Sequence, residues 1–445
     1  MEKEICSKLL KYQIPHAENI VNILKNKNIC LDGSDTGTGK TYVAMAVIKH
    51  LKLKPIIICP KTIMSSWQKV ANIFNVEVLC IVNYETITRG KYYNKNKIDS
   101  EIRTENPYVE IDEKYIDYYK WTLPENTLII FDEAHHCCND KTLNAKLLLS
   151  LQNIYNNNVR ILLLSASLAY NQVKFKVFGY LFKWYDNINW APDWIKNPKY
   201  NPASASIQIN NKLYPDFGNR MRIADLGSDF PISQISAESY DIPNFTKIEK
   251  EYNEIKKVIT DIKEKNKEDN NIIFTKIIRA RQSIELYKIP IFIELTNEFL
   301  ENGYSVVIFV NFVETLNILA KKLNTTCIIS GEQNLKTKEN NIDNFVSNLN
   351  RVIICNIQSG SEAISLNDKT GLHPRISLIS PTWSGTKLLQ AFGRTQRSDS
   401  KSIALNRIIF CAKTIEEKIC NRINDLIKNL NVIRDDDLNV FSNNY

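Results

Sequence analysis

The residues best suited to chemistry lie in one loop, residues 34–41, with the sequence SDTGTGKT. Gly37 and Gly39 allow the backbone to turn its N–H groups toward phosphate oxygens. Lys40 is placed to reach the β- and γ-phosphates, and the Thr41 hydroxyl is placed to bind Mg²⁺. The spacing therefore predicts a nucleoside triphosphate site, with ATP and Mg²⁺ as the expected ligands.

The segments on either side of this loop have the order that such a site requires. Residues 29–31 form a short apolar run that suits a buried strand, and residues 42–51 have apolar side chains at helical spacing. Strand, glycine-rich loop and helix together place the phosphates at a helix N-terminus. Ser34 stands where the common phosphate loop has Gly, and a small residue there is typical of nucleic-acid helicases. The alternative is a glycine-rich turn with a chance lysine.

Two adjacent acids, Asp132 and Glu133, directly follow the apolar run 128–131. A carboxylate at the end of a strand can coordinate Mg²⁺ through water, and the next carboxylate can orient and polarise the attacking water. Phosphoryl transfer requires mainly positioning and charge neutralisation. We therefore expect both acids to face Lys40 and Thr41.

Two serines, Ser165 and Ser167, follow the next apolar run, residues 161–164. We expect their hydroxyls to hydrogen-bond Asp132 or His135 and to sense the state of the nucleotide. A plain turn explains these serines equally well.

The second half of the chain carries a basic segment at residues 390–397. Arg394 and Arg397 are three residues apart, so both guanidinium groups point the same way on a helix. We expect them to complete the γ-phosphate site as arginine fingers do, and a basic helix face in water is the alternative. Residues 359–363 follow the apolar run 352–355 and are expected to meet both nucleic-acid phosphates and ATP.

Runs of consecutive apolar residues alternate with helical patterns in both halves of the chain. Such runs suit strands that are buried on both faces of a parallel sheet. They lie at residues 55–59, 76–82, 128–131 and 161–164, and then at 305–310, 326–329, 352–355, 376–379 and 407–411. We predict an α/β fold with two successive units.

Changes in residue composition along the chain suggest the limits of these units. The first is expected over residues 1–227, including a Trp-rich extension at 182–227 that packs as structure rather than splitting a duplex. A linker and helical segment at 228–300 leads into the second unit, 301–445. Residues 89–121 interrupt the first unit with charges and tyrosines. They are interpreted as a solvated surface insertion, with a surface for stacking bases as the alternative.

The composition excludes several classes of protein. The 445 residues carry 57 Lys and Arg against 49 Asp and Glu, and the net charge of +8 is only weak support for a polyanionic partner. Ten cysteines include no C-x-x-C pair, so reduced thiols are expected rather than a zinc site. The N-terminus has no signal-peptide pattern, and no apolar run approaches about 18 residues. We expect a soluble intracellular protein.

The order of these segments resembles that of superfamily-2 helicases and translocases, and more closely their Swi/Snf-like branch. The resemblance covers nearly the whole chain. Five further segments carry it, namely Tyr12-Gln13 (adenine-reading element), residues 59–63 with Trp67 (grip on the tracked strand), residues 83–87 (NYETI), residues 306–312 (first strand of the second lobe) and residues 414–419 (TIEEKI, closing element). Residues 363–368 and 393–398 also resemble strawberry-notch and large-virus helicases. Together with an A+T-rich residue bias, they suggest a large DNA virus or another mobile element as the origin.

The resemblance implies two tandem RecA-like domains, with parallel sheets flanked by helices and with helical or irregular insertions. It also implies roles for residues at matching positions. These are hydrolysis (Glu133, Gln390, Arg394, Arg397), ATP binding (Gln13, Gly37, Thr38, Gly39, Lys40, Thr41), Mg²⁺ binding (Thr41, Asp132), coupling (His135, Ser165, Ser167, Gly360) and nucleic-acid contact (Lys61, Thr62, Tyr84, Asn311, Ser359).

The leading interpretation is a nucleic-acid-stimulated ATPase that moves along DNA as a helicase or translocase, with protein partners for targeting. One departure from the branch favours a second interpretation, a nucleotide-switched clamp with weak turnover. The fifth motif of the branch has two adjacent glycines, whereas Gly360 is followed by Ser361. An RNA helicase is a third interpretation, because a grip on the backbone need not distinguish the sugars.

Overall fold

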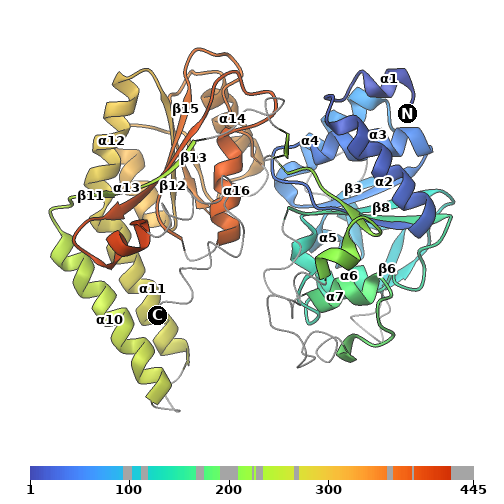
Figure 1. Ribbon diagram of the computed structural model, residues 1–445, viewed down its shortest axis with the longest axis horizontal. Helices are drawn as coiled ribbons and strands as arrows, with labels where there is room; N and C mark the ends of the chain where they lie inside the picture. The colour runs from blue at the N-terminus through green and yellow to red at the C-terminus, as the bar shows by residue number, and fades with distance from the viewer. Residues whose placement is uncertain are drawn as a thin grey trace. The chain divides into compact units, whose positions relative to one another are not determined.

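The computed structural model of the protein describes residues 1–93, 103–111, 119–166, 175–190, 209–222, 225–226, 234–264, 270–357, 364–382 and 385–421. The chain divides into two compact units, Met1–Asp229 and Phe230–Tyr445 (Figure 1). Among the described helices, none combines the length and the apolar character that crossing a membrane requires.

The first unit is built on a six-stranded parallel sheet with the strand order β10-β1-β9-β8-β2-β3. Its strands are β1 (Ile29–Asp32), β2 (Lys54–Cys59), β3 (Cys80–Asn83), β8 (Thr127–Asp132), β9 (Val159–Leu164) and β10 (Gly218–Asn219). All six residues of β8 are buried because helices cover both faces of the sheet. The phosphate loop follows β1, and the acid pair lies at the end of β8.

The helices of the first unit lie on both faces of this sheet. One face is covered by α2 (Gln13–Lys27), α3 (Lys40–Leu51) and α4 (Met64–Phe74), with the short α1 (Lys3–Cys6) beside α3 (Figure 1). The other face is covered by α5 (Tyr84–Ile87), α6 (Leu143–Leu149) and α7 (Lys176–Leu181). Single 3₁₀ turns occur at η1 (Lys61–Ile63), η3 (Ala134–Cys137) and η5 (Ile188–Trp190).

The insertion at residues 89–121 forms two small antiparallel pairs, β4 (Lys91–Tyr93) with β5 (Arg103–Glu105) and β6 (Val109–Ile111) with β7 (Tyr119–Trp121). Three of its described aromatic side chains pack against the rest of the first unit. Tyr93 and Tyr119 are buried, and the Trp121 indole donates to Ser150 Oγ at 2.7 Å. These three rings therefore anchor the insertion and are not displayed for base stacking.

The second unit has its own six-stranded parallel sheet, with the order β11-β16-β15-β12-β14-β13. Its strands are β11 (Gln234–Tyr240), β12 (Ser305–Val310), β13 (Ile328–Ile329), β14 (Val352–Asn356), β15 (Arg375–Ile379) and β16 (Leu405–Cys411). The predicted α/β fold with two parallel sheets is confirmed.

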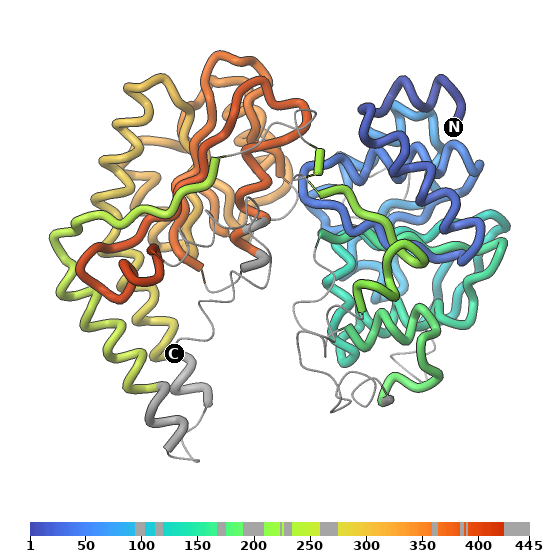
Figure 2. The backbone as a smooth tube through the Cα atoms, in the orientation of Figure 1, coloured from blue at the N-terminus to red at the C-terminus, as the bar shows by residue number. Residues whose placement is uncertain are grey.

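Helices also cover both faces of the second sheet. On one side lie α12 (Ile289–Glu301) and α13 (Val313–Lys322), and on the other lie α14 (Leu335–Val346) and α16 (Gly385–Thr395) (Figure 1). The helices α10 (Phe245–Glu264) and α11 (Asn270–Tyr287) run side by side (Figure 2). They belong to the second unit by their contacts, and the expected boundaries at residues 227 and 300 stay a prediction.

Candidate active site

The phosphate loop leaves β1 and enters α3 through two glycines. Gly37 and Gly39 both have a φ of 92°, a left-handed conformation that favours glycine. Gly39 is the N-cap of α3, so the N–H groups of the first helical turn are available to an anion. The Lys40 ammonium reaches across the loop and donates to the carbonyl oxygens of Ser34 at 2.7 Å and Asp35 at 3.2 Å. This geometry matches that of a phosphate-binding loop.

Gln13 lies directly beneath this loop. Its Nε2 donates to the carbonyl oxygen of Thr38 at 2.8 Å, and its Oε1 accepts from the backbone N–H of Leu10 at 2.9 Å. A Cβ atom at Gly39 would lie 2.2 Å from Gln13 Nε2, so a larger residue there would displace the Gln13 amide, and the positive φ of Gly39 independently favours glycine. The described contacts show Gln13 bracing the loop, and its contact with adenine stays a prediction.

Ser34, the departure from the common glycine pattern, has a clear structural role. Its buried hydroxyl donates to Asp32 Oδ1, lies 3.2 Å from His16 Nε2, and accepts from the backbone N–H of Met221 at 2.9 Å. Burial alone would raise the pKa of Asp32, but the charge and hydrogen bond of His16, together with Lys40 and Ser34, hold that pKa below its usual value. Ser34 therefore ties the loop to α2 and to the segment that carries β10.

The acid pair lies at the same edge of the sheet as the loop. Asp32 of β1 and Asp132 of β8 pair with Leu164 of β9 from opposite sides. Asp132 Oδ1 accepts from the backbone N–H of Glu133 at 2.9 Å, and Oδ2 accepts from the Trp67 indole at 2.8 Å. The phosphate loop and the acid pair therefore lie at one edge of the sheet, and that both acids face Lys40 and Thr41 stays a prediction.

The charge of Asp132 is poorly compensated by the protein. Burial and the neighbouring Glu133 carboxylate raise the pKa of Asp132 to about 7, against the lowering effects of the Trp67 hydrogen bond and of Lys40. Glu133 itself has a φ of 54°, a conformation that strains a residue other than glycine. Strained backbone conformations and shifted pKa values both occur preferentially at functional sites.

The residues predicted to couple hydrolysis to movement are partly described. His135 Nδ1 lies 3.3 Å from Ser165 Oγ and 3.3 Å from Glu133 Oε2. The contact of Ser165 with His135 is one of the two that were expected for this serine. Ser167, Ser359 and Gly360 lie outside the described residues.

The predicted nucleic-acid residues of the first unit differ in exposure. Lys61 is exposed on η1, and the hydroxyl of Thr62 is buried with no hydrogen-bond partner among the described residues. Tyr84 is only 3% exposed, and its hydroxyl donates to the carbonyl oxygen of Asp132 at 2.8 Å. Its direct contact with nucleic acid stays a prediction, while its observed partner is the acid pair.

The arginines of the second unit are held by the segment that precedes their helix in the sequence. Arg394 Nη1 and Arg397 Nη2 both donate to the carbonyl oxygen of Ile364, at 3.4 and 3.0 Å. Arg394 is buried, as is Gln390 on the same helix, α16. The two guanidinium groups therefore converge on one backbone atom. They do not share a helix as expected, because α16 ends at Thr395 and Arg397 lies beyond it.

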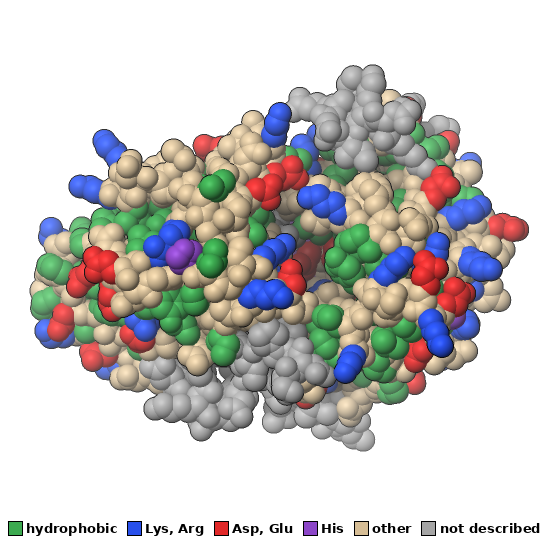
Figure 3. All heavy atoms as spheres, turned by 90° about the horizontal axis from the view of Figure 1, so that it is seen from above, with side chains coloured by type: hydrophobic (Ala, Val, Ile, Leu, Met, Phe, Trp, Pro, Cys, Tyr) green, Lys and Arg blue, Asp and Glu red, His purple; other side chains and the backbone are tan. Residues whose placement is uncertain are grey.

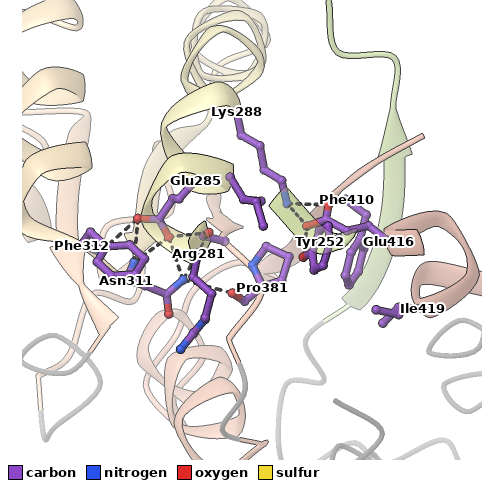
Figure 4. Close-up of a pocket in the computed structure, with 12 residues that line it drawn as sticks. Tyr252, Arg281, Glu285, Lys288, Asn311, Phe312, Pro381, Phe410, Glu416 and Ile419 are labelled. Carbon is purple, nitrogen blue, oxygen red and sulfur yellow. Dashed lines mark hydrogen bonds and ion pairs between the residues drawn. The ribbon is translucent and has the colours of Figure 1, made fainter. Parts of the chain in front are cut away.

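A small pocket lies at the carboxyl ends of β12, β15 and β16 in the second unit (Figure 4). Its volume of about 30 Å³ holds water but not a nucleotide. In its wall the Glu285 carboxylate accepts from the backbone N–H groups of Asn311 and Phe312, from Asn311 Nδ2 at 2.7 Å and from Ser380 Oγ at 2.6 Å. Because Asn311 Nδ2 is engaged with the protein, the predicted contact of Asn311 with nucleic acid would have to be made by its Oδ1.

A second carboxylate of this pocket, Glu416, belongs to the closing element TIEEKI. It forms a buried ion pair with Lys288, with an N–O distance of 2.5 Å. It also accepts from the Tyr252 hydroxyl at 2.6 Å (Figure 4). The backbone N–H of Cys411 donates to it at 2.7 Å. The closing element is thus tied to α10, to the start of α12 and to the end of β16.

Two parallel-sheet units, the first with a phosphate loop beside an acid pair, give the chain the fold of the RecA-like class. The family described as "Type III restriction enzyme, res subunit" matches residues 7–169, and that described as "Helicase conserved C-terminal domain" matches residues 287–399. With the relative reported next, these matches show that the chain belongs to the superfamily-2 helicases and is an ATP-hydrolysing helicase.

That relative is a protein of Acanthamoeba polyphaga mimivirus named "Putative ATP-dependent RNA helicase L364". It is 37% identical over 462 residues, covering 98% of this chain and 86% of the relative. Among solved structures, S. cerevisiae Dbp5 bound to RNA and ADP BeF3 has a TM-score of 0.53 at 14% identity. The Sulfolobus solfataricus SWI2/SNF2 ATPase core in complex with dsDNA has a TM-score of 0.39 at 16% identity. Both alignments cover 98% of this chain and 93% of the other, and the first shows a shared fold.

Three residues that take part in the ATP site were not predicted to do so from the sequence. His16 lies three residues after Gln13, and that helical spacing placed it near the loop. Trp67 was noted only as part of the strand-gripping segment, although a buried indole needs an acceptor. Met221 had no sequence signal, because its contact depends on the two-residue strand β10.

Proposed function

We propose that this helicase couples ATP hydrolysis to movement along a nucleic acid that stimulates the hydrolysis. The observation that carries the proposal is the common sheet edge of the phosphate loop and the acid pair. The ATP phosphates would bind the backbone N–H groups of Gly37, Thr38 and Gly39 and the side chains of Lys40 and Thr41. Gln13 would hold the loop in shape and read the adenine.

The donor set of the site fits Mg²⁺. The Thr41 hydroxyl and the Asp132 carboxylate are hard oxygen ligands of the kind that Mg²⁺ prefers. The raised pKa of Asp132 also indicates a buried negative charge that the protein leaves largely uncompensated. Mg²⁺ held there would neutralise charge on the phosphates.

Hydrolysis is assigned to residues of both units. Glu133 would orient the attacking water and accept its proton. Arg394, Arg397 and Gln390 would supply the γ-phosphate contacts from the second unit. His135, Ser165, Ser167 and Gly360 would relay the state of the nucleotide to the residues that bind nucleic acid.

The nucleic acid would be held by its backbone. Lys61 and Thr62 precede α4, and Asn311 and Ser359 follow strands of the second unit. Backbone contacts position a strand without reading its sequence. DNA is the proposed substrate from the Swi/Snf-like motifs, and RNA is the alternative favoured by the name of the mimiviral relative. That relative also supports the proposed origin in a large DNA virus.

The test compares ATP hydrolysis alone and with single-stranded DNA, duplex DNA and RNA of matched sequence, together with strand displacement. We expect at least one nucleic acid to raise kcat. Glu133→Gln should lower the stimulated kcat by about 10²- to 10⁴-fold, because it removes the general base. Unchanged stimulated hydrolysis in Glu133→Gln or in Lys40→Ala would refute the assignment.

A nucleotide-switched clamp is the second candidate, favoured by Ser361 after Gly360 in the fifth motif. A clamp would bind nucleic acid differently with and without ATP, yet its turnover would change little on binding. The same assay separates the two, because nucleotide-dependent binding without stimulation is the result expected only of the clamp.

A further inference from the structure

Two hydrogen bonds from different elements converge on one residue of the acid pair. The Trp67 indole N–H, from α4, donates to Asp132 Oδ2 at 2.8 Å. The Tyr84 hydroxyl, from α5, donates to the Asp132 carbonyl oxygen at 2.8 Å. Asp132 is therefore held through its side chain and its backbone by two aromatic residues.

Both elements are continuous with residues proposed to grip the nucleic acid. Lys61 and Thr62 lie on η1, which runs directly into α4, and Trp67 follows Thr62 by five residues. Tyr84 is the first residue of α5, and its neighbour Glu85 is exposed. A nucleic acid bound at either turn therefore lies within one or two helical turns of a bond to Asp132.

The surroundings make these contacts stiff. Trp67 is fully buried, so the indole cannot shift without repacking its neighbours. The single turn of α5 is held on both sides by the insertion. The Tyr93 hydroxyl donates to Asn83 Oδ1 at 3.1 Å, and the Tyr119 hydroxyl donates to the carbonyl oxygen of Thr88 at 3.1 Å.

We propose that Trp67 and Tyr84 are positioning residues that transmit nucleic-acid binding to Asp132, so that the bound strand stimulates hydrolysis by fixing this carboxylate. The inference rests on the proposed function, because it needs hydrolysis that nucleic acid stimulates. Trp67 acts on one carboxylate oxygen and Tyr84 on the backbone. Each oxygen of Asp132 accepts one described hydrogen bond and retains a second lone pair for a further ligand.

The alternative is that both rings only fill the core. Trp67→Phe and Tyr84→Phe separate the two roles, because each keeps a ring and removes one donor. We expect the ratio of stimulated to basal kcat to fall about tenfold in each variant, the effect of one hydrogen bond to an ionised or catalytic group. In the double variant the ratio should approach one. KM for ATP should stay near the wild-type value, which a general loss of packing would not spare.

Two matched controls exist in the same unit. Trp121→Phe removes an indole bond to Ser150 (2.7 Å), and Tyr155→Phe removes a hydroxyl bond to the Leu181 carbonyl oxygen (3.0 Å). Both should keep the wild-type ratio. Should Trp67→Phe fail to fold, Tyr84→Phe carries the test. A direct reading comes from 5-fluorotryptophan and ¹⁹F NMR, in which the most buried indole resonance should shift when nucleic acid is added without nucleotide.

The outcomes distinguish the two proposals. If no nucleic acid stimulates the wild-type chain, the proposed function fails and the inference fails with it. If the wild type is stimulated and a folded Tyr84→Phe or Trp67→Phe keeps the full ratio, the inference alone is wrong. A fall in the ratio that also appears in the two controls would likewise overturn it.

Discussion

Buried carboxylates lie at corresponding edges of the two parallel sheets, but the two units surround them with different numbers of hydrogen-bond donors and counter-ions. Asp132 of the first unit has one described donor on each oxygen, and its pKa is raised to about 7 by burial and by Glu133. Glu285 and Glu416 of the second unit are buried as deeply, yet each is surrounded by donors. Glu285 accepts from two backbone N–H groups, an amide and a hydroxyl, and Glu416 pairs with Lys288.

The number of hydrogen-bond donors that the protein supplies thus distinguishes a carboxylate suited to bind a ligand from one that stabilises the fold. A buried charge must be compensated by hydrogen bonds, by a counter-ion or by protonation. In the second unit the protein supplies that compensation, whereas in the first unit the proposed Mg²⁺ would supply it. Surface charge does not reveal this difference, because on the face in Figure 3 positive and negative side chains intermingle among the described residues of both units.

The strongest test of this comparison is to remove the counter-ion of Glu416. Lys288→Met leaves a buried carboxylate without its cation, and we expect a loss of about 3–5 kcal/mol in the free energy of unfolding. Urea unfolding measures the loss, and hydrogen exchange in peptides of β16 and α12 locates it. Lys413→Met at the exposed Lys413–Asp241 pair should change stability little. Recovery in Lys288→Met/Glu416→Gln would confirm that the unpaired charge is the cause.

The second prediction concerns Asp132, where the opposite result is expected. Asp132→Asn should lower Mg²⁺-dependent ATP hydrolysis by about 10²- to 10³-fold, because a preorganised charge at the phosphates is lost. Its free energy of unfolding should change by less than about 1 kcal/mol, since removing a poorly compensated charge offsets one lost hydrogen bond. A large destabilisation would break the comparison, because it would show that Asp132 also holds the fold.

The third prediction returns to the second unit. Glu285→Gln replaces one acceptor oxygen by an N–H₂ group that faces donors, so we expect a loss of about 1–3 kcal/mol. Because Glu285 holds Asn311, the affinity for nucleic acid should fall as well, measured by fluorescence anisotropy with a labelled strand. Glu314→Gln is a matched control, since the exposed Glu314 accepts a hydrogen bond from the side chain of Gln282. Equal effects of the two substitutions would argue against a structural role for the carboxylate.

The sequence predicted the fold and much of the first-unit site because local patterns determine both. Gly37, Gly39 and Lys40 are recognisable from spacing, and Asp132 from its place after an apolar run. The roles of Ser34, Trp67 and Glu285 could not be predicted, because each has a partner between 26 and 187 residues away in the chain. Tyr84 was assigned to nucleic acid from a motif, whereas its burial against Asp132 appears only when the sheet is assembled.

A smaller effect is expected at Asp32, a carboxylate of the first unit that the protein does compensate. Ser34→Ala removes one donor to Asp32 and leaves the Met221 N–H without its acceptor. We expect a loss of about 1–2 kcal/mol in stability and a higher KM for ATP. Ser402→Ala removes a similar bond to Asp368, of 2.7 Å, in the second unit. That control should leave KM for ATP unchanged, and a change there would make the effect of Ser34→Ala unspecific.

The smallest predicted effect is on pH dependence, and it follows from burial in the first unit. Burial and the neighbouring His135 lower the pKa of His136 to about 4. Because the unfolded chain takes up this proton near pH 6.5 and the folded chain does not, stability is lost as pH falls from about 6.5 to about 4. His136 is partly exposed, so we expect an effect of only about 1 kcal/mol. Asp132, with its raised pKa, has the opposite slope over this range, so the two partly cancel in the wild type.

His136→Phe separates these slopes because it keeps the ring contacts with Tyr84 and His135, at centroid distances of 5.5 and 4.6 Å, and removes the titrating group. The variant should become more stable as pH falls from 7 toward 4.5, measured by urea unfolding with hydrogen exchange in peptides of the first unit. An unchanged pH profile in His136→Phe would mean that burial at this sheet edge does not favour the neutral forms of its ionisable side chains. The contrast with the compensated carboxylates of the second unit would then lose its physical basis.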